Sequence, residues 1–325
     1  MKVLFVASGN TAVLGLAPFI ISQAESLVKA GVEVRIFTVK GRGFRGYLRA
    51  AREISKELKK YPADVIHAHY VLCGWAALLA FSAKPLVLSL LGTDTYGRYV
   101  AVGKVSAASR LLRLLTWVIQ PFVRMIIVKT EQMRRSVFRR RICRVIANGV
   151  DLDKFKHAEK EYRDELGLAG GKKYLLFLGD PGNRRKNLVL AEEALALLQR
   201  PEVELLKPYP LAHEQVPCYL NAVDVLLQPS LMEGSPNLVK EAMACNCPVV
   251  ATDVGDVRWL FGDLPGYYLA GFKPNDFMLK IRQALDFAAT TGRTQGRRRI
   301  VDLGLDAPAV AAKIIDVYRE ATRFE

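Results

Sequence analysis

The chain has 325 residues, of which 51% are hydrophobic and 24% are charged, a composition that excludes disordered and fibrous proteins. This length exceeds what one hydrophobic core usually supports, so we expect two domains. Residues 1–150 hold 24 Lys and Arg against 7 Asp and Glu, whereas the remainder holds 23 against 25, and this asymmetry points to an anionic partner for the first half, such as a membrane surface, a nucleic acid or an acidic substrate.

Short apolar segments alternate with helical ones along the first half of the chain. Strands are predicted at residues 3–7, 32–39, 64–67, 86–90 and 125–128, with helices ending at residue 30 and spanning 45–60, 71–82 and about 105–120. Apolar strands that alternate with helices form βαβ units around a parallel sheet buried on both faces. Residues 1–150 are therefore expected to form one doubly wound α/β domain.

A polar segment with a Gly-Gly pair, residues 147–173, is predicted to link two domains. The alternation then resumes, with strands at 174–178, 203–206, 225–228 and 249–251 and helices at 187–199, 214–222 and 237–245. Residues 151–306 are expected to form a second doubly wound domain. The last helix lies in residues 307–325, which are expected to pack back toward the N-terminal domain. Ligands are expected at the carboxyl ends of the strands and between the domains.

The five cysteines are scattered and odd in number, which predicts free thiols in a reducing compartment and a cytoplasmic location. Cys245 and Cys247 lack the second pair that a zinc site would need. We expect no signal peptide in residues 1–19, because the apolar run KVLFVA is too short.

Residues 111–128, LLRLLTWVIQPFVRMIIV, are interrupted by Arg, Gln and Pro and are not expected to span a membrane. Their mixture of Leu, Trp and Arg is typical of interfacial helices, and a buried helix with snorkelling arginines is the alternative. With the basic runs at 134–135 and 139–141, the segment predicts attachment to an anionic membrane surface. No nucleic acid is expected, because the arginines are not interleaved with exposed aromatic residues.

Two carboxylates eight positions apart, Glu233 and Glu241, stand in the stretch MEGSPNLVKEAMACNCPVV. The stretch follows the predicted strand 225–228 and opens a helix, whose N-terminal amides favour a phosphate. We expect Ser235 as the N-cap and Pro236 as the first helical residue. Glu233 could then reach sugar hydroxyls, and Glu241 could accept both hydroxyls of a ribose. The alternative is a capped helix with two solvated glutamates.

Three consecutive cations, Arg184, Arg185 and Lys186, follow the predicted strand 174–178 in LGDPGNRRKNLVL. Cations beside a helix N-terminus are electrostatically unfavourable unless an anion joins them. A diphosphate held by this loop and the Ser235 loop would supply that anion. The alternative is that the three cations extend into solvent.

Four motifs in order resemble the retaining glycosyltransferases of family 4, also described as glycosyl transferases group 1. They are DVIHAHY, ANGVDLDKF, the Lys186 loop and EGSPNLVKEAMACNCPVVATDVGDV, which contains the E-x7-E pair. The resemblance implies an α/β GT-B fold, with two doubly wound Rossmann-like domains facing across a cleft. The N-terminal domain would bind the acceptor and the C-terminal domain the nucleotide sugar.

The resemblance also implies roles for individual residues. Glu241 would bind the donor ribose and Glu233 the transferred sugar, both acting beside the leaving diphosphate. Lys186, with Arg184 or Arg185, would neutralise that diphosphate. The segment that cradles the sugar and the phosphate would be Ser235, Pro236, Asn237 and Leu238.

The implied reaction transfers a sugar with retention from a UDP- or GDP-sugar, without a further cofactor, to a glycan or lipid-linked acceptor of the cell envelope. An oxocarbenium-like transition state would collapse on the face of the leaving group, so that neither a second carboxylate nor a metal is needed. We expect the pair Asp151 and Asp153 to be structural and His67 to lie in the core. The acceptor is expected near Gly9, Asn10, Gly15, His69 and Asp94.

The chain departs from the family at Leu91, where the usual HGxD segment carries a histidine. His69 or Asp94 would have to replace that histidine. The departure motivates an alternative, a glycosyltransferase-like subunit without turnover that acts as a partner at the membrane. A sugar-nucleotide epimerase is a third possibility, which the E-x7-E pattern disfavours.

Overall fold

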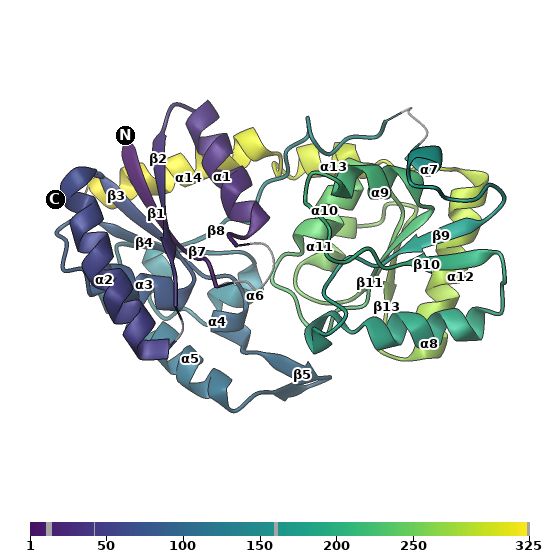
Figure 1. Ribbon diagram of the computed structural model, residues 1–325, viewed down its shortest axis with the longest axis horizontal. Coiled ribbons are helices and arrows are strands. Elements are labelled where there is room, and N and C mark those ends of the chain that lie inside the picture. Colours follow the sequence, from purple (N-terminus) through teal and green to yellow (C-terminus); the bar gives the residue numbers. More distant parts are fainter. Residues whose placement is uncertain (11–14, 42, 159–161, 324–325) are drawn as a thin grey trace. The chain divides into compact units, whose positions relative to one another are not determined.

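The computed structural model describes residues 1–10, 15–41, 43–158 and 162–323. The chain divides into two compact units (Figure 1). Unit 1 contains residues 1–98, 106–149 and the segment from 307 onward, and unit 2 contains residues 99–105 and 150–306. The chain passes from unit 1 to unit 2 after Gly149, and residues 307 onward lie in unit 1. The sequence did not indicate that residues 99–105, a short antiparallel hairpin of β5 (Tyr99–Ala101) and β6 (Lys104–Val105), belong to unit 2.

Unit 1 is built on a parallel sheet in the order β2-β1-β3-β4-β7-β8. Five of these strands were predicted, whereas the three-residue edge strand β8 was not. The strands are β1 (Lys2–Ser8), β2 (Glu33–Val39), β3 (Val65–His69), β4 (Leu86–Ser89), β7 (Met125–Val128) and β8 (Cys143–Val145).

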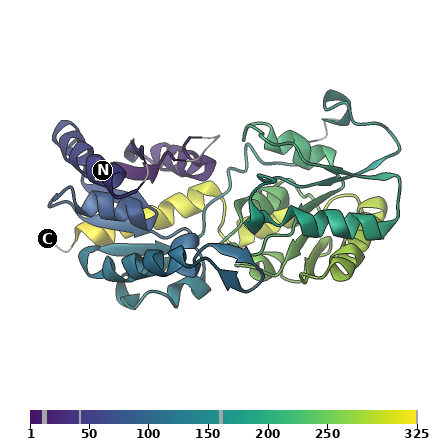
Figure 2. The same ribbon diagram turned by 60° about the horizontal axis from the view of Figure 1, so that its bottom comes forward.

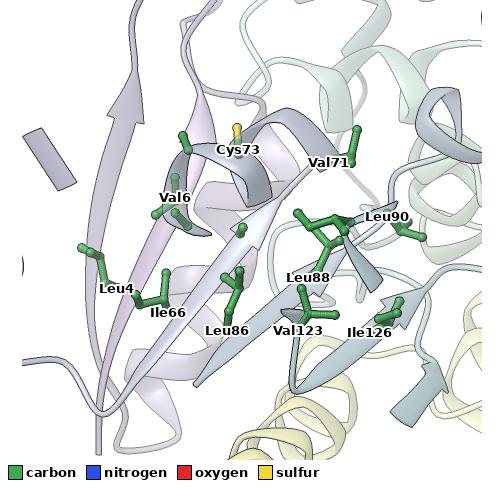
Figure 3. Packing of buried hydrophobic residues seen from close by; sticks show 14 of the residues in the cluster. Leu4, Val6, Ile66, Val71, Cys73, Leu86, Leu88, Leu90, Val123 and Ile126 are labelled. Atoms are coloured by element: carbon green, nitrogen blue, oxygen red, sulfur yellow. The ribbon is translucent and has the colours of Figure 1, made fainter. Parts of the chain in front are cut away.

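Helices cover both faces of this sheet, and alternate side chains of each strand point to opposite faces. Leu4 and Val6 pack with Ile66 and with Cys73 on one face (Figure 3). The helices on that face are α2 (Gly43–Lys60), α3 (Val71–Leu78) and α5 (Ala108–Val118). The other face is covered by α1 (Pro18–Lys29) and α14 (Ala307–Thr322), the last helix, in yellow (Figure 2). Short helices α4 (Thr93–Tyr96) and α6 (Glu131–Arg134) follow β4 and β7.

Unit 2 is built on a second parallel sheet in the order β10-β9-β11-β12-β13. Its strands are β9 (Lys173–Leu176), β10 (Val203–Leu206), β11 (Val225–Gln228), β12 (Val249–Thr252) and β13 (Tyr267–Ala270). Its helices are α7 (Tyr162–Glu165), α8 (Leu188–Leu198), α9 (Val216–Ala222), α10 (Asn237–Ala244), α11 (Val257–Phe261), α12 (Pro274–Thr290) and α13 (Gly296–Asp302). Strand β13 and the long helix α12 were not predicted, and α8 and α12 pack together over one face of this sheet.

The strand order reverses in each unit beside its first strand. In unit 1, β2 and β3 lie on opposite sides of β1, and in unit 2, β10 and β11 lie on opposite sides of β9. The loops that leave the carboxyl ends of two such strands diverge, and ligands of doubly wound sheets bind where they diverge. In unit 2 these loops follow β9 and β11, and they carry the three cations and Glu233.

Other sequence-based expectations concern the linker and the cysteines. The carboxylate of Asp151 accepts hydrogen bonds from the backbone amides of Asp153 and Lys154 at 2.9 and 3.2 Å, a structural use as predicted. All five cysteines are free thiols, as predicted. Within the described parts of the chain, no helix is both long enough and apolar enough to span a membrane.

Candidate functional site

The loops after β9 and β11 are joined to each other by hydrogen bonds. The amide of Leu231 donates to the carbonyl of Arg185 at 2.8 Å, and the side chain of Asn187 donates to the carbonyl of Pro229 at 3.0 Å. Asn187 adopts a left-handed conformation (φ 55°), which asparagine tolerates better than most residues. The turn of 3₁₀ helix at Arg184–Lys186 is thereby fixed against the loop that carries Glu233.

Glu233 is buried, and its carboxylate lies among two of the three cations. Its Oε2 pairs with Arg185 at 2.6 Å and its Oε1 with Lys186 at 2.8 Å. Oε1 also accepts hydrogen bonds from Ser230 at 2.9 Å and Gln228 at 3.1 Å. The alternatives of a solvated Glu233 and of cations that extend into solvent are therefore wrong for Glu233, Arg185 and Lys186, and these two cations have an anionic partner before any diphosphate binds. Glu233 itself is the anion beside them.

These partners decide the charge of Glu233. Burial alone would raise the pKa of this carboxyl group, but the charges of Lys186 and Arg185 and the hydrogen bonds to it prevail and lower the pKa to about 2. Glu233 is thus ionised at neutral pH. Arg184 is exposed and pairs with no acidic side chain in the described structure.

Helix α10 begins at Asn237, the start of the predicted range 237–245, but its cap lies one residue later than predicted. Pro236 is the N-cap, and Ser235 does not cap the helix, because its hydroxyl group accepts no hydrogen bond from an amide of α10. The ring of Pro236 fixes the backbone at the helix start, in place of the side-chain cap that was expected from Ser235. Asn237 and Leu238 are the first two helical residues, and their amides belong to the exposed set at the helix start.

A second buried polar group lies beside this helix start. Both carboxylate oxygens of Asp256 and the hydroxyl of Ser235 are buried beside this helix start. Burial raises the pKa of Asp256 to about 6, although the charge of Lys240 opposes the shift. Gly255 is needed here, because a Cβ on it would lie 2.1 Å from the carbonyl oxygen of Gly234. Sequence analysis assigned no role to Asp256, although it lies near the end of the quoted segment EGSPNLVKEAMACNCPVVATDVGDV.

Glu241 is held by a histidine that the sequence reading also missed. The Nε2 atom of His213 lies 2.9 Å from Oε1 of Glu241, and its Nδ1 atom lies 3.0 Å from Nζ of Lys154. An ammonium group can only donate, so Nδ1 accepts and the ring hydrogen lies on Nε2, which donates to Glu241. This contact engages only Oε1, and Phe155 packs against the imidazole at 5.3 Å between ring centroids. A lone histidine in the irregular segment before α9 gave no periodic signal.

The residues predicted on the acceptor side all lie in unit 1, and several have structural roles there. Gly9 packs against β2, since a Cβ would lie 2.3 Å from Cγ2 of Thr38. Asn10 exchanges two hydrogen bonds with the backbone of Gly41, at 2.8 and 3.0 Å. Gly15 has a positive φ of 61° in an exposed position. Gly9 and Asn10 follow β1 at the place where the strand order reverses.

His67 and His69 point to the same face of β3, which extends two residues further than predicted. His67 is a core residue, as expected, and its ring nitrogens lie 2.6 Å from the hydroxyl of Tyr318 and 2.8 Å from that of Ser89. His69 is also buried, but neither ring nitrogen has a hydrogen-bond partner in the described residues. Burial, followed by the charge of Lys129, lowers the pKa of His69 to about 3, so it is neutral.

Asp94 is fully buried, and its carboxylate caps the turn that begins at Leu91. The amides of Leu91 and Gly92 both donate to Oδ1 at 2.9 Å. Burial raises the pKa of Asp94 to about 6, although these hydrogen bonds oppose the shift. These amides fix the carboxylate of Asp94 in the turn, and the expectation that Asp94 or His69 replaces the family's histidine stays a prediction.

Two family models match successive parts of the chain. Glycosyltransferase Family 4 matches residues 13–154, and Glycosyl transferases group 1 matches residues 159–286. The chain belongs to this glycosyltransferase family. It is 30% identical over 240 residues to the glycosyltransferase TuaC of Bacillus subtilis, whose name places it in teichuronic acid biosynthesis. The aligned region covers 66% of this chain and only 60% of TuaC.

Solved structures give the fold a name. Sucrose-phosphate synthase from Thermosynechococcus elongatus superimposes with a TM-score of 0.83 at 18% identity over 100% of both chains. Anabaena HepE in complex with UDP and glucose superimposes with a TM-score of 0.75 at 17% identity, over 98% of this chain and 99% of HepE. The predicted fold is confirmed: each unit of the family 4 chain is a doubly wound α/β domain, and the architecture is GT-B.

Proposed function

We propose that this family 4 chain is a retaining glycosyltransferase that moves a sugar from a UDP- or GDP-sugar to a glycan or lipid-linked acceptor of the cell envelope. The observation that carries the proposal is the cluster of Arg185 and Lys186 around the buried Glu233 at the switch point of unit 2. Similarity to TuaC supports the cell-envelope acceptor, and the UDP bound to HepE supports the donor class.

The charges of the cluster suit a diphosphate. Arg184, Arg185 and Lys186 carry three positive charges and Glu233 one negative charge, which leaves two positive charges beside the start of α10. A sugar nucleotide carries two negative charges on its diphosphate. Lys186 has three N–H donors, so it can keep its contact with Glu233 while it donates to a phosphate. These groups would stabilise the leaving diphosphate without a metal ion.

Glu233 suits a retaining reaction without a covalent intermediate. Its Oε1 accepts three donors and its Oε2 is paired with Arg185. A carboxylate held in this way is a poor nucleophile, but Oε2 has capacity for one sugar hydroxyl. We therefore assign Glu233 to the transferred sugar and Glu241, through Oε2, to the ribose. His213 would fix the orientation of Glu241.

The proposal is tested by mixing the purified chain with a panel of UDP- and GDP-sugars and measuring nucleoside diphosphate release and thermal stability. A true donor at saturating excess should stabilise the fold by roughly 3–4 kcal/mol. Nucleoside diphosphate release, with an α-linked product from an α-linked donor by NMR, supports a retaining transferase. Stabilisation without release in the presence of acceptor extracts would instead favour the non-catalytic subunit, which the leucine at position 91 motivates. Conversion of one nucleotide sugar into its epimer without an acceptor would indicate an epimerase.

We further propose that the chain works in the cytoplasm at the inner face of the cell membrane, where lipid-linked acceptors are found. The support is the charge of unit 1, whose residues 106–149 contain ten Lys and Arg and a single acidic residue, Glu131. Such a surface attracts anionic lipids.

A further inference from the structure

One face of helix α5 and the turns beside it expose six large apolar side chains. Single exposed apolar residues are common on soluble proteins, but a contiguous group marks an interaction surface. Leu111, Leu114 and Val118 share one face by their spacing of three and seven residues. The aromatic rings of Trp117 and Phe138 lie 5.0 Å apart. The apolar ridge, with exposed fractions between 39% and 62%, consists of Leu111, Leu114, Trp117, Val118, Phe122 and Phe138.

The opposite face of α5 packs against the core of unit 1. The ridge is therefore the outward face of the helix and is not needed for packing within unit 1. Thr116 is buried and donates to the carbonyl of Asp94 at 2.8 Å. Leu112 and Leu115 pack against the core, and Trp75 donates to the carbonyl of Leu115 at 3.2 Å. The helix is therefore fixed by one face, and its other face is free for a partner.

A basic pocket of about 500 Å³ adjoins the ridge at the carboxyl ends of β4 and β7. Trp117 belongs to both the ridge and the pocket. Two arginines come from α5 and one from the segment after α6. The residues that line the pocket are Asp94, Thr95, Arg110, Arg113, Thr116, Trp117, Arg135 and Ser136.

The three pocket arginines differ from their neighbours in lacking protein partners. Arg139 donates to three backbone carbonyls, and Arg144 pairs with Glu320. Within the described chain, Arg110, Arg113 and Arg135 make no side-chain hydrogen bond or ion pair. The one carboxylate of the pocket, Asp94, is already occupied by backbone amides. Three unpaired guanidinium groups around one pocket match a phosphate, which arginine binds through two parallel hydrogen bonds.

The ridge decides which phosphate-bearing partner fits. Contrary to the sequence-based expectation, exposed aromatic residues do lie beside the arginines, so a nucleic acid must be weighed. Bases would stack on Trp117 and Phe138, but the aliphatic side chains of Leu111, Leu114 and Val118 offer no stacking plane. Aliphatic, tryptophan and arginine side chains together suit the boundary between lipid headgroups and acyl chains.

We propose that helix α5 docks on an anionic phospholipid bilayer, with the ridge inserted at the acyl boundary and Arg110, Arg113 and Arg135 bound to a lipid phosphate in the pocket. This proposal names the surface through which the chain would reach the membrane, and it therefore rests on the membrane location given under the proposed function. Donor binding belongs to other residues, in unit 2. Vesicle binding can thus be measured without donor or acceptor, and either proposal can fail alone.

The test is co-sedimentation of the full chain with phosphatidylcholine vesicles that contain or lack 30% phosphatidylglycerol. We expect binding only to the anionic vesicles, weakened by salt, and a blue shift of tryptophan fluorescence that Trp117→Phe largely removes. The single substitutions Arg110→Gln and Arg113→Gln should each weaken vesicle binding about five-fold, which is equivalent to about 1 kcal/mol per basic residue near the membrane surface. Leu114→Ser with Trp117→Ser should abolish detectable binding.

Matched controls separate this surface from general charge and apolarity. Arg52→Gln with Lys56→Gln removes two exposed cations from α2 of the same unit, and Trp259→Ser removes an exposed tryptophan from unit 2. Both should bind vesicles at least half as tightly as the natural sequence. The proposal is overturned if neutral vesicles bind equally, if the controls weaken binding as much as the α5 variants, or if no vesicle binds. It is also overturned if the α5 variants bind vesicles normally and instead lose self-association or lose binding to RNA.

Discussion

The two units use their positive charge in opposite ways. In unit 2, Arg185 and Lys186 surround a buried carboxylate at the switch point of the sheet. In unit 1, Arg110 and Arg113 line an open pocket and have no acidic partner among the described residues. Paired cations are held in place before a ligand arrives, whereas unpaired cations on a surface attract a partner. Under the two proposals, unit 2 would use its positive charge to bind the donor and unit 1 would use its positive charge to bind a membrane.

The largest effect is expected at Lys186. Lys186→Met should lower sugar transfer on the order of 10²–10³-fold, because it removes a donor aimed at the charge that develops on the diphosphate. The measurement is initial-rate kinetics with saturating donor. The matched control is Lys207→Met, whose partner Glu192 lies on an exposed surface, and transfer by this variant should stay within two-fold of the natural sequence. Equal losses in both variants would remove Lys186 from the chemistry.

The paired cations of unit 2 should also make stability depend on acid. The pKa of Glu233 is about 2 in the folded chain and 4.5 in the unfolded chain, so its contribution is present above pH 4.5 and is lost as the pH falls toward 2. The full contribution is about 3 kcal/mol for a shift of this size. Glu233→Gln should flatten the fall in unfolding free energy between pH 5 and pH 3, measured by urea denaturation. An unchanged slope would contradict the ion-pair cluster.

A smaller effect is expected at the hydrogen bond between His213 and Glu241. His213→Ala should raise the KM for the donor by roughly 10–100-fold with little change in kcat, since a hydrogen bond to a charged group is worth roughly 1.5–3 kcal/mol. His213→Gln keeps a donor for Glu241 and should recover most of the loss. The exposed His157→Ala is the control. A fall in kcat alone, or no recovery by glutamine, would argue against a positioning role.

The smallest effect is expected in unit 1. Arg110→Gln and Arg113→Gln should each change the free energy of unfolding by less than about 0.5 kcal/mol, because these side chains make no contact that folding needs. Thermal and urea denaturation measure this directly. A loss above 1 kcal/mol would mean that these cations have structural partners, and the contrast between the units would fail.

Much of the fold could be predicted because buried parallel strands are short apolar runs. Strands β7, β10 and β11 have the predicted bounds. The apolar runs MIIV of β7 and VLL of β11 are flanked by polar residues, whereas β10 was predicted although Glu204 interrupts its run. The edge strand β8 is only three residues long, and its CRV sequence has no such run. Direct contacts between side chains that lie far apart in the sequence could not be predicted. Lys186 and Glu233 are 47 positions apart, and only the strand order places them together.

The site was predicted by position but not by environment. Motif spacing identified Glu233, Glu241 and Lys186, whereas their partners carry no motif. His213 belongs to an irregular segment, where neither helical nor strand periodicity marks a residue as facing a ligand. The sequence did not show that the carboxylate of Asp94 caps its own turn, because such a carboxylate looks, in sequence, like one that faces a ligand.

Isothermal titration calorimetry of UDP and GDP against the full chain tests the donor site most directly, with the monophosphates UMP and GMP, Glu241→Gln and the exposed-site variant Glu193→Gln as controls. The account predicts that one nucleoside diphosphate binds at one site per chain and at least about tenfold more tightly than its monophosphate, since two charges of the cation cluster await the diphosphate. Glu241→Gln should weaken this binding at least tenfold, and Glu193→Gln should leave it unchanged. Failure of both diphosphates to bind, or equal binding by Glu241→Gln and the natural sequence, would contradict the assignment of the donor site to unit 2.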